Sequence, residues 1–259
     1  MAGMKINLNA DLGESFGAWK MGEDEALLGV VCSANIACGF HAGDPRVMRD
    51  TVRRALAAGV GLGAHPSYPD LQGFGRRPMT MAPADVEAAV IYQVGALAGF
   101  AAAEGGRLRH VKPHGALNNQ ACEDAALAGC IARAVRAVDR ELILLAPALS
   151  ELYAAGERAG LPVAAEVFAD RAYTDAATLV PRGQNGAVLH DPEAVVAHVL
   201  RMLDAGGIVA RSGKLLPTPM HSICVHGDNP GAVDNARRLR AALEGRGWQL
   251  TGLPQVLAA

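Results

Sequence analysis

The sequence predicts an α/β fold in which strands and helices alternate along the chain and the strands close into a parallel βα barrel. Short apolar runs alternate with longer amphipathic stretches over the 259 residues. Histidines, carboxylates and amides gather in the glycine- and proline-bearing turns that follow the apolar runs. Active sites of βα barrels lie at the carboxyl ends of their strands, so this distribution favours a barrel over an open sheet. We expect one domain over residues 1–259.

Seven short apolar segments are predicted to be strands, because glycine, proline or aspartate bounds many of them. They cover residues 5–9, 34–38, 60–64, 108–112, 141–145, 163–167 and 222–225. Helices are predicted between them, since several intervening stretches have proline or an acidic residue in the first turn and glycine beyond the end. These helices cover residues 23–31, 45–58, 83–104, 123–138, 148–159, 192–205 and 232–245. Residues 206–219 interrupt the alternation and are expected to form a β-hairpin or an irregular excursion.

Charge and composition exclude several functional classes. The net charge of −2 and the isoelectric point near 6.4 provide no basic field for nucleic acid or an anionic membrane. No GxGxxG follows a predicted strand, and residues 207–214 (GIVARSGK) lack the spacing and the Ser or Thr of a P-loop. A small neutral or acidic molecule is therefore the expected ligand, and any use of ATP would need another protein or a different site.

Cysteine usage and the amino-terminal sequence predict a cytoplasmic protein. Five cysteines without CxxC spacing indicate reduced thiols. The first residues lack the basic and apolar stretches of a secretory signal, and no uncharged apolar segment reaches 18 residues. We therefore expect neither secretion nor a membrane span.

Three consecutive strand ends each carry one potential metal ligand. Asp11 is expected just after the first strand, His41 just after the second, and His65 at the end of the third. One carboxylate and two imidazoles suit a divalent transition metal such as zinc. The structural alternative is that each polar group caps a turn or a helix, as predicted for Asp44 before Pro45.

His110 and His114 form an HxxxH spacing that does not predict a shared metal here. They are expected at a strand and its end, where residues four apart are separated by about 13 Å. His114, between Pro113 and Gly115, is expected at the functional end of the barrel. His110 is expected to be structural.

Further charged residues at strand ends are candidates for binding substrate or transferring protons. Lys112, inside an apolar strand, is equally compatible with anion binding and with a structural ion pair. Glu166 and Arg171 end another strand, and Arg171 could bind a carboxylate or form a surface salt bridge. His226 and Asp228 follow the last strand and are candidate acid/base or orienting groups.

Seven ordered motifs, spread over nearly the whole chain, closely resemble the LamB/YcsF family. They are NADLGE (9–14), ANIACGFHAGDP (34–45), GAHPSYPD (63–70), GFGRR (73–77), VKPHGALNN (111–119), EVFADRAY (166–173) and VHGDNP (225–230). The resemblance implies a distorted seven-stranded βα barrel similar to NodB-like polysaccharide deacetylases. Asn118 departs from the family pattern, which has tyrosine at this position.

The resemblance also implies an activity and partners. The implied reaction is hydrolysis of 5-oxo-L-proline to L-glutamate coupled to ATP cleavage, in a 5-oxoprolinase complex that includes subunits B and C. Since this chain lacks a P-loop, ATP is expected to bind with the partner subunits. The sequence leaves open whether copies of this chain also form a homo-oligomer.

Opening a five-membered lactam requires an activated carbonyl, a delivered water and a proton for the leaving nitrogen. We expect Asp11, His41 and His65 to hold a metal or the activated carbonyl end, and His114 and His226 to transfer protons. Lys112 or Arg171 would pair with the substrate carboxylate.

Two other functions suit the same residues. The first is a stand-alone metal-dependent deacetylase or amidohydrolase. Two features count against it. The HxxxH spacing lies along a predicted strand, where the two histidines would not share a metal ion, and the 4% aromatic content offers few side chains that could stack on a sugar. The second is a non-catalytic subunit that binds 5-oxoproline or organises its partners.

Overall fold

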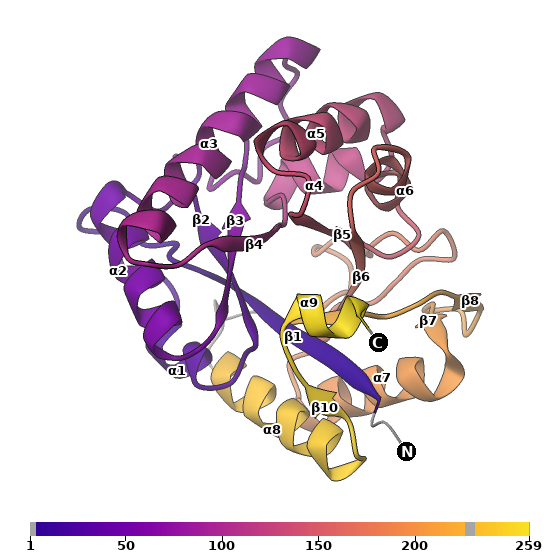
Figure 1. Cartoon of the computed structure of the whole chain (residues 1–259). Coiled ribbons are helices and arrows are strands. Elements are labelled where there is room, and N and C mark those ends of the chain that lie inside the picture. Colours follow the sequence, from indigo (N-terminus) through magenta and orange to yellow (C-terminus); the bar gives the residue numbers. More distant parts are fainter. Residues whose placement is uncertain (1–3, 226–230, 259) are drawn as a thin grey trace.

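Seven parallel strands close into a barrel in the computed structural model, which describes residues 4–225 and 231–258. Each strand pairs with the next along the chain, and the last pairs back with the first, which completes the ring (Figure 1). The strands are β1 (Lys5–Leu12), β2 (Ser33–Ala37), β3 (Gly61–His65), β4 (Leu108–Val111), β5 (Ile143–Pro147), β6 (Val163–Phe168) and β9 (Ser222–Val225). The predicted seven-stranded βα barrel is therefore confirmed.

Helices surround the ring of strands (Figure 1). The seven predicted helices are all present, with ends shifted by up to three residues: α1 (Asp24–Leu28), α2 (Pro45–Ala57), α3 (Pro83–Ala103), α5 (Ala125–Val138), α6 (Glu151–Arg158), α7 (Pro192–Ala205) and α8 (Ala232–Gly245). Local sequence sets several of the starts. Asp44 accepts hydrogen bonds from the backbone N–H groups of Arg46 and Val47, so its predicted capping role is confirmed.

Several short elements complete the fold. The expected hairpin consists of β7 (Gly207–Val209) and β8 (Leu215–Pro217), which pair in antiparallel fashion. Three elements were not predicted: α4 (Gly115–Ala121), β10 (Gln249–Leu250) and α9 (Leu253–Leu257). Each is too short to show a helical or strand period in the sequence.

Strand β1 ends later than predicted, and the expectation that Asp11 follows the strand is wrong. Asn7, Asn9 and Asp11 alternate with the apolar residues of β1, and both asparagines are fully buried. Because polar residues occupy one face of this strand, the sequence predicted its end too early. Asp11 therefore lies within β1, paired with Asn35 of β2 in the strand register.

The interior of the barrel is polar. The Asn35 side-chain amide donates to Asn9 Oδ1 at 2.7 Å, and His110 Nε2 lies 2.7 Å from Asn35 Oδ1. His110 reaches Asn35 across β3 over Gly63, where a Cβ atom would overlap the His110 ring. The structure thus gives His110 a packing role within the barrel. The main apolar core lies between the strands and the helices, where Leu8, Val94 and Ile131 are fully buried.

Helix α3 is long and apolar enough, by length and composition, to cross a membrane, the one such helix among residues 4–225 and 231–258. In the structure it packs against α5, α2, β3 and β4. Gln93, at its centre, accepts from the backbone N–H of Ser67 and donates to the carbonyl of the same residue. These contacts place α3 in the layer of helices around the barrel.

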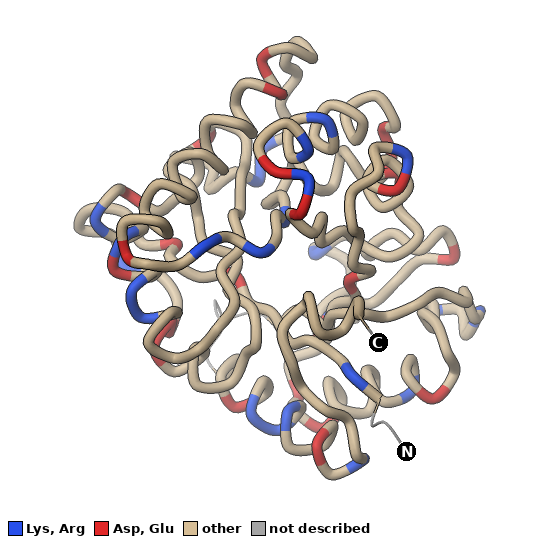
Figure 2. The backbone as a smooth tube through the Cα atoms, in the orientation of Figure 1, with Lys and Arg blue, Asp and Glu red and all other residues tan. Residues whose placement is uncertain are grey.

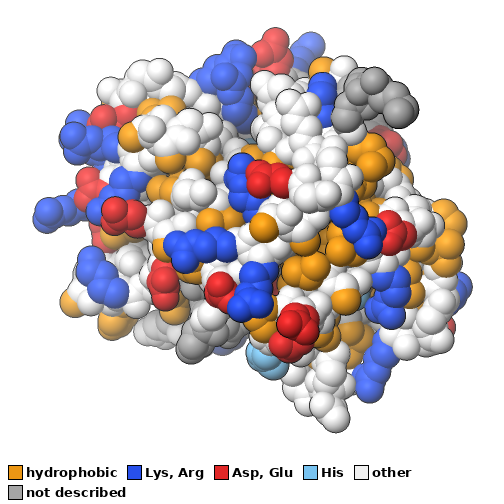
Figure 3. Space-filling view, turned by 90° about the horizontal axis from the view of Figure 1, so that it is seen from below, with side chains coloured by type: hydrophobic (Ala, Val, Ile, Leu, Met, Phe, Trp, Pro, Cys, Tyr) orange, Lys and Arg blue, Asp and Glu red, His pale blue; other side chains and the backbone are white. Residues whose placement is uncertain are grey.

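Charged residues of both signs are distributed over the helices and turns around the barrel (Figure 2). The face shown in Figure 3 also carries both signs, interspersed with exposed apolar side chains. Neither sign forms a continuous field on that face.

Candidate active site

A cavity of about 700 Å³ opens at the carboxyl ends of the barrel strands. Its wall includes Asp11 of β1, His65 of β3, Pro147 of β5 and Phe168 of β6. Residues of the segments 21–24 and 171–182 also line it. The cavity therefore lies where βα barrels collect their catalytic groups.

One glutamate and three histidines form a tight cluster at this end of the barrel. The members are Glu14, His41, His65 and His114, and one ligand atom from each lies within 4.8 Å of the others. Glu14 Oε1 is 3.2 Å from His41 Nε2 and 3.4 Å from His114 Nδ1. The His41 and His114 rings stack with their centroids 3.8 Å apart.

Backbone carbonyls determine which nitrogens of two histidines carry hydrogen. His65 Nδ1 lies 2.6 Å from the Lys112 carbonyl, and His114 Nε2 lies 2.9 Å from the Phe74 carbonyl. A carbonyl can only accept, so both of these nitrogens donate. In the neutral rings, His65 Nε2 and His114 Nδ1 then carry lone pairs, yet they lie 2.9 Å apart. Two acceptors at this distance repel each other unless a proton or a metal ion binds them.

Burial favours the neutral form of His41 and of His114. It lowers the pKa of His41 and of His114 well below the usual value, and neighbouring histidines lower them further. Burial also raises the pKa of Glu14, an effect that His114 opposes. Neutral imidazoles whose second nitrogen donates to a backbone carbonyl are typical metal ligands. The residues present therefore fit a divalent metal ion.

Glu14 is not among the site residues predicted from the sequence. It follows Gly13, whose φ of +70° turns the chain at the end of β1. This turn brings Glu14 into the cluster, a change of direction that strand periodicity does not encode. The acidic ending of the NADLGE motif was the available signal.

Asp11 lies at the edge of the cluster. Its Oδ2 atom is 3.3 Å from His65 Nε2, while its Oδ1 atom accepts from the Lys112 ammonium at 3.0 Å and from Asn35 at 2.8 Å. Asp11 thus connects the histidines to Lys112. The structure brings together the predicted His41, His65 and His114, with Glu14 in the position expected for Asp11.

Lys112 forms a buried ion-pair network. Its side chain is 3% exposed, and its ammonium lies 3.0 Å from both Asp11 Oδ1 and Glu166 Oε1. It also contacts Asn9 Oδ1 at 3.3 Å and Cys224 Sγ at 3.1 Å. Of the two interpretations of Lys112, the structure shows the ion pair. Substrate binding by Lys112 and Glu166 stays a prediction.

Arg171 lines the cavity, but its guanidinium donates hydrogen bonds to backbone carbonyls. Its Nη2 atom donates to the Val180 carbonyl at 2.7 Å, and its Nε atom donates to the Ala187 carbonyl at 3.4 Å. Arg171 therefore anchors the segment that follows it. The predicted site residues His226 and Asp228 lie outside the described residues.

The GFGRR turn closes one side of the cluster. Phe74 contacts both His41 and His114 through edge-to-face ring packing. Gly75 has φ +64°, and a Cβ atom there would overlap Ser67 Oγ and lie 2.8 Å from His114. Glycine is needed at this position for both reasons.

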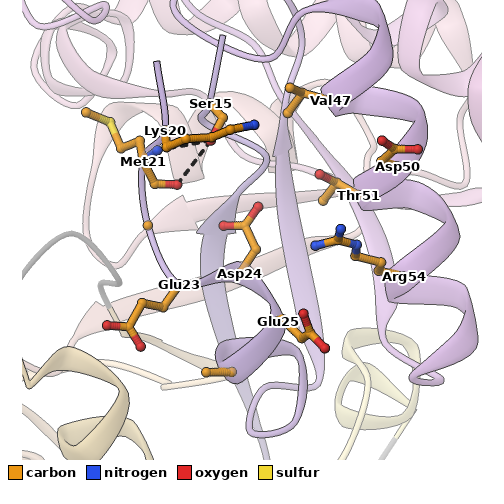
Figure 4. Close-up of a pocket in the computed structure, with 12 residues that line it drawn as sticks. Ser15, Lys20, Met21, Glu23, Asp24, Glu25, Val47, Asp50, Thr51 and Arg54 are labelled. Carbon is orange, nitrogen blue, oxygen red and sulfur yellow. Dashed lines mark hydrogen bonds between the residues drawn. The ribbon is translucent and has the colours of Figure 1, made fainter. Parts of the chain in front are cut away.

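A smaller cavity of about 440 Å³ adjoins the first and shares Met21, Gly22 and Asp24 with it. Figure 4 shows Asp24 and Arg54 on facing walls of this cavity. Asp24 Oδ2 accepts from the Gly13 backbone N–H at 2.9 Å. Asp24 therefore holds the turn that carries Glu14 to the cluster.

Asn118 of the VKPHGALNN motif lies in the wall of the larger cavity. It is 6% exposed, in the middle of α4. The departure from the expected motif at this position therefore falls in the lining of the site rather than on the outer surface.

Comparison with known proteins agrees with this architecture. The sequence pattern of the LamB/YcsF family matches residues 6–258. A protein of Azoarcus sp. (strain BH72), named as the A subunit of 5-oxoprolinase, is 79% identical over 98% of this chain and 99% of its own length. A lactam utilization protein from Thermus thermophilus superposes with a TM-score of 0.91 at 44% identity, covering 96% of this chain and 100% of that one.

A more distant similarity concerns the fold alone. A peptidoglycan N-acetylglucosamine deacetylase superposes with a TM-score of 0.51 at 12% identity, over 98% of this chain and 88% of that one. The expected similarity of the barrel to polysaccharide deacetylases is therefore confirmed.

Proposed function

The chain belongs to the LamB/YcsF family, and on this premise we propose that it is the A subunit of an ATP-dependent 5-oxoprolinase. In this role it opens the ring of 5-oxo-L-proline by hydrolysis to give L-glutamate. The proposal is supported by the name of the Azoarcus relative and by the lactam utilization protein of the same fold.

The observation that carries the chemistry is the 2.9 Å contact between His65 Nε2 and His114 Nδ1. A divalent ion bound by these nitrogens, with His41 and Glu14, would replace their repulsion with coordination. Such an ion supplies Lewis acidity, which polarises an amide carbonyl and makes water more acidic. Amide opening needs both effects.

Among residues 4–225 and 231–258, Asp11 is the one best placed to transfer protons. It lines the cavity beside His65, and its second oxygen is held by Lys112. In the proposed mechanism, Asp11 accepts a proton from the attacking water and returns it to the ring nitrogen as the amide bond breaks. Proton transfer by His114 stays a prediction; its Nδ1 atom faces Glu14 in the cluster and its Nε2 atom donates to the Phe74 carbonyl, so we assign it to the metal site.

ATP binding requires the partner proteins in this proposal, because the sequence of this chain lacks a P-loop. We propose that ATP binds to the complex with the B and C subunits and that this complex lies in the cytoplasm. ATP would transfer its terminal phosphoryl group to the amide oxygen, so that water adds to an activated carbon. Cleavage of the C–N bond would then leave an acyl phosphate, from which a second water releases phosphate and L-glutamate.

The test is glutamate release from 5-oxo-L-proline by the purified chain, alone and with the B and C subunits, each with and without ATP. We expect release only when the partners and ATP are both present. Release of acetate from acetylated sugars by the zinc-loaded chain alone would instead establish a stand-alone deacetylase.

The same assembly separates catalysis from simple binding. His65→Ala is expected to abolish turnover while the complex still forms and still binds 5-oxoproline. Unchanged turnover in that variant would favour the non-catalytic subunit.

A further inference from the structure

Asn118 places a buried polar atom in the wall of the larger cavity. The residue is 6% exposed, and its Oδ1 atom accepts no hydrogen bond from any of residues 4–225 and 231–258. Burying an amide oxygen without a donor lowers the stability of a protein, and such atoms are rare in folded chains. A donor on a molecule bound in the cavity would satisfy this oxygen.

Helix α4 places Asn118 close to the Glu/His cluster. His114 of the cluster is the N-cap of this helix, and the Asn118 backbone N–H lies 3.4 Å from the His114 carbonyl. Residues four apart lie on one face of a helix, with Cβ atoms about 5–6 Å apart. Cys122, four residues further, lines the cavity as well. His114, Asn118 and Cys122 therefore follow one another along the cavity wall, with Asn118 one turn from the cluster.

A cyclic amide carries a donor that suits this arrangement. A five-membered ring holds its amide in the cis form, so the C=O and N–H groups point to the same side of the C–N bond. When the carbonyl faces the cluster, the N–H beside it can therefore face Asn118. An open-chain secondary amide is trans, and its N–H points away from the carbonyl. The cluster and Asn118 together thus match the edge of a lactam.

We propose that Asn118 Oδ1 accepts a hydrogen bond from the ring N–H of the lactam and so distinguishes a lactam from a lactone of the same shape. This inference rests on the proposed function and adds a residue that determines its specificity. In a lactone an oxygen replaces the ring N–H. That oxygen cannot donate, so Asn118 Oδ1 would stay unpaired and would face a second acceptor.

The test compares the dissociation constants of 5-oxo-L-proline and of its lactone analogue, measured by calorimetry on the chain assembled with its partner subunits, without ATP. The wild-type assembly is expected to bind the lactone about ten-fold more weakly, since one hydrogen bond is lost and one buried acceptor is left unpaired. Asn118→Leu should bind the two ligands equally to within about two-fold, because leucine offers no acceptor to either.

Two further variants separate recognition from packing. Asn118→Asp keeps an acceptor at this position, so it should keep the preference for the lactam, although its charge weakens the binding of both anionic ligands. Asn185→Leu is the matched control, since Asn185 is exposed and lies outside the cavity lining. It should show the wild-type preference.

Urea unfolding gives an independent measurement. The midpoint of Asn118→Leu should not fall below that of the wild type, because leucine is of similar size and replaces an oxygen that has no partner in the described part of the chain. A lower midpoint together with an equal loss of affinity for both ligands would show that Asn118 serves packing, and would overturn the proposal.

The proposal is also overturned if the wild type binds lactam and lactone equally, or if Asn118→Leu keeps the wild-type preference. These measurements need no turnover, so they are distinct from the test of the proposed function. A wild-type assembly that prefers the lactam through Asn118 but releases no glutamate with ATP would overturn the proposed hydrolysis and support the lactam-binding role of Asn118.

Discussion

His65 Nε2 and His114 Nδ1 lie 2.9 Å apart, although the other nitrogen of each ring donates to a backbone carbonyl. Both facing nitrogens are therefore acceptors in the neutral rings, and Glu14 adds a carboxylate beside them. Proteins arrange ring nitrogens in this way to coordinate metal ions. The contact connects the barrel fold to the hydrolytic chemistry proposed for this chain.

Removing the carboxylate of Glu14 should weaken metal binding more than removing that of Asp11. Glu14 lies within the cluster, whereas Asp11 lies at its edge and is shared with Lys112. We expect elemental analysis after zinc loading and dialysis to find about one ion per chain in the wild type and in Asp11→Asn. Glu14→Gln should retain much less. Equal retention in the two variants would show that the cluster is not the metal site.

Lys112→Met should destabilise the protein strongly, because it leaves the buried Glu166 and the partly buried Asp11 without their common cation. Removing one partner of a buried pair typically costs about 3–5 kcal/mol. We expect a loss of this size in the free energy of unfolding, measured with urea. Arg158 forms an exposed ion pair with Glu151. Arg158→Met should therefore lower the free energy of unfolding by less than about 1 kcal/mol.

The double variant Lys112→Met/Glu166→Gln provides the internal check. It also replaces the carboxylate of Glu166, which Lys112→Met leaves without a cation, by a neutral amide. Part of the lost free energy of unfolding should therefore return. Equal instability of the single and double variants would contradict an electrostatic origin.

Stability should fall on acidification through His110. Burial and the nearby Lys112 lower the pKa of His110 from 6.5 to about 3. Between these values the unfolded chain binds the proton and the folded chain does not, so stability present above pH 6.5 is lost as the pH falls toward 3. At pH 5 the loss from this residue is about 2 kcal/mol.

The variant His110→Gln isolates this contribution. Glutamine keeps a donor for Asn35 but does not titrate. The decrease in the free energy of unfolding from pH 7.5 to pH 5.0 should therefore be smaller in His110→Gln than in the wild type. An identical decrease in both proteins would rule out His110 as a source of the pH dependence.

Gly75→Ala should damage the cluster, whereas Gly105→Ala should not. Both glycines have positive φ, but a Cβ atom at Gly75 would meet Ser67 and His114, and one at Gly105 would meet nothing within 4 Å. Both variants should lose a similar backbone contribution to stability, about 1 kcal/mol. Only Gly75→Ala should also lose bound zinc, as elemental analysis would show. Normal zinc binding in Gly75→Ala would argue against the tight seating of this turn on His114.

The sequence predicted the barrel well because the strand and helix segments each carry local signals. Apolar runs bounded by turn residues located β2, β3, β6 and β9 to within one residue. The polar face of β1 hid the end of that strand, since Asn7 and Asn9 fill the barrel interior instead of facing water and Asp11 continues the same face into the cavity.

The candidate site was only partly predictable. His41, His65 and His114 were identified because each lies at or just beyond the end of a strand. Glu14 was missed because a turn at Gly13 redirects the chain, and the pairing of Lys112 with both Asp11 and Glu166 depends on strands far apart in sequence.

Glutamate release from 5-oxo-L-proline in the assembly with the B and C subunits and ATP, compared between wild type and His65→Ala, tests the role of the Glu/His cluster most directly. The control for folding and assembly is Arg107→Gln, which changes an exposed residue 3.9 Å from Glu141 and outside the cavity. We predict wild-type rates for the control and no release above background for His65→Ala in an intact complex. Equal rates for His65→Ala and wild type would contradict the claim that the Glu/His cluster opens the lactam.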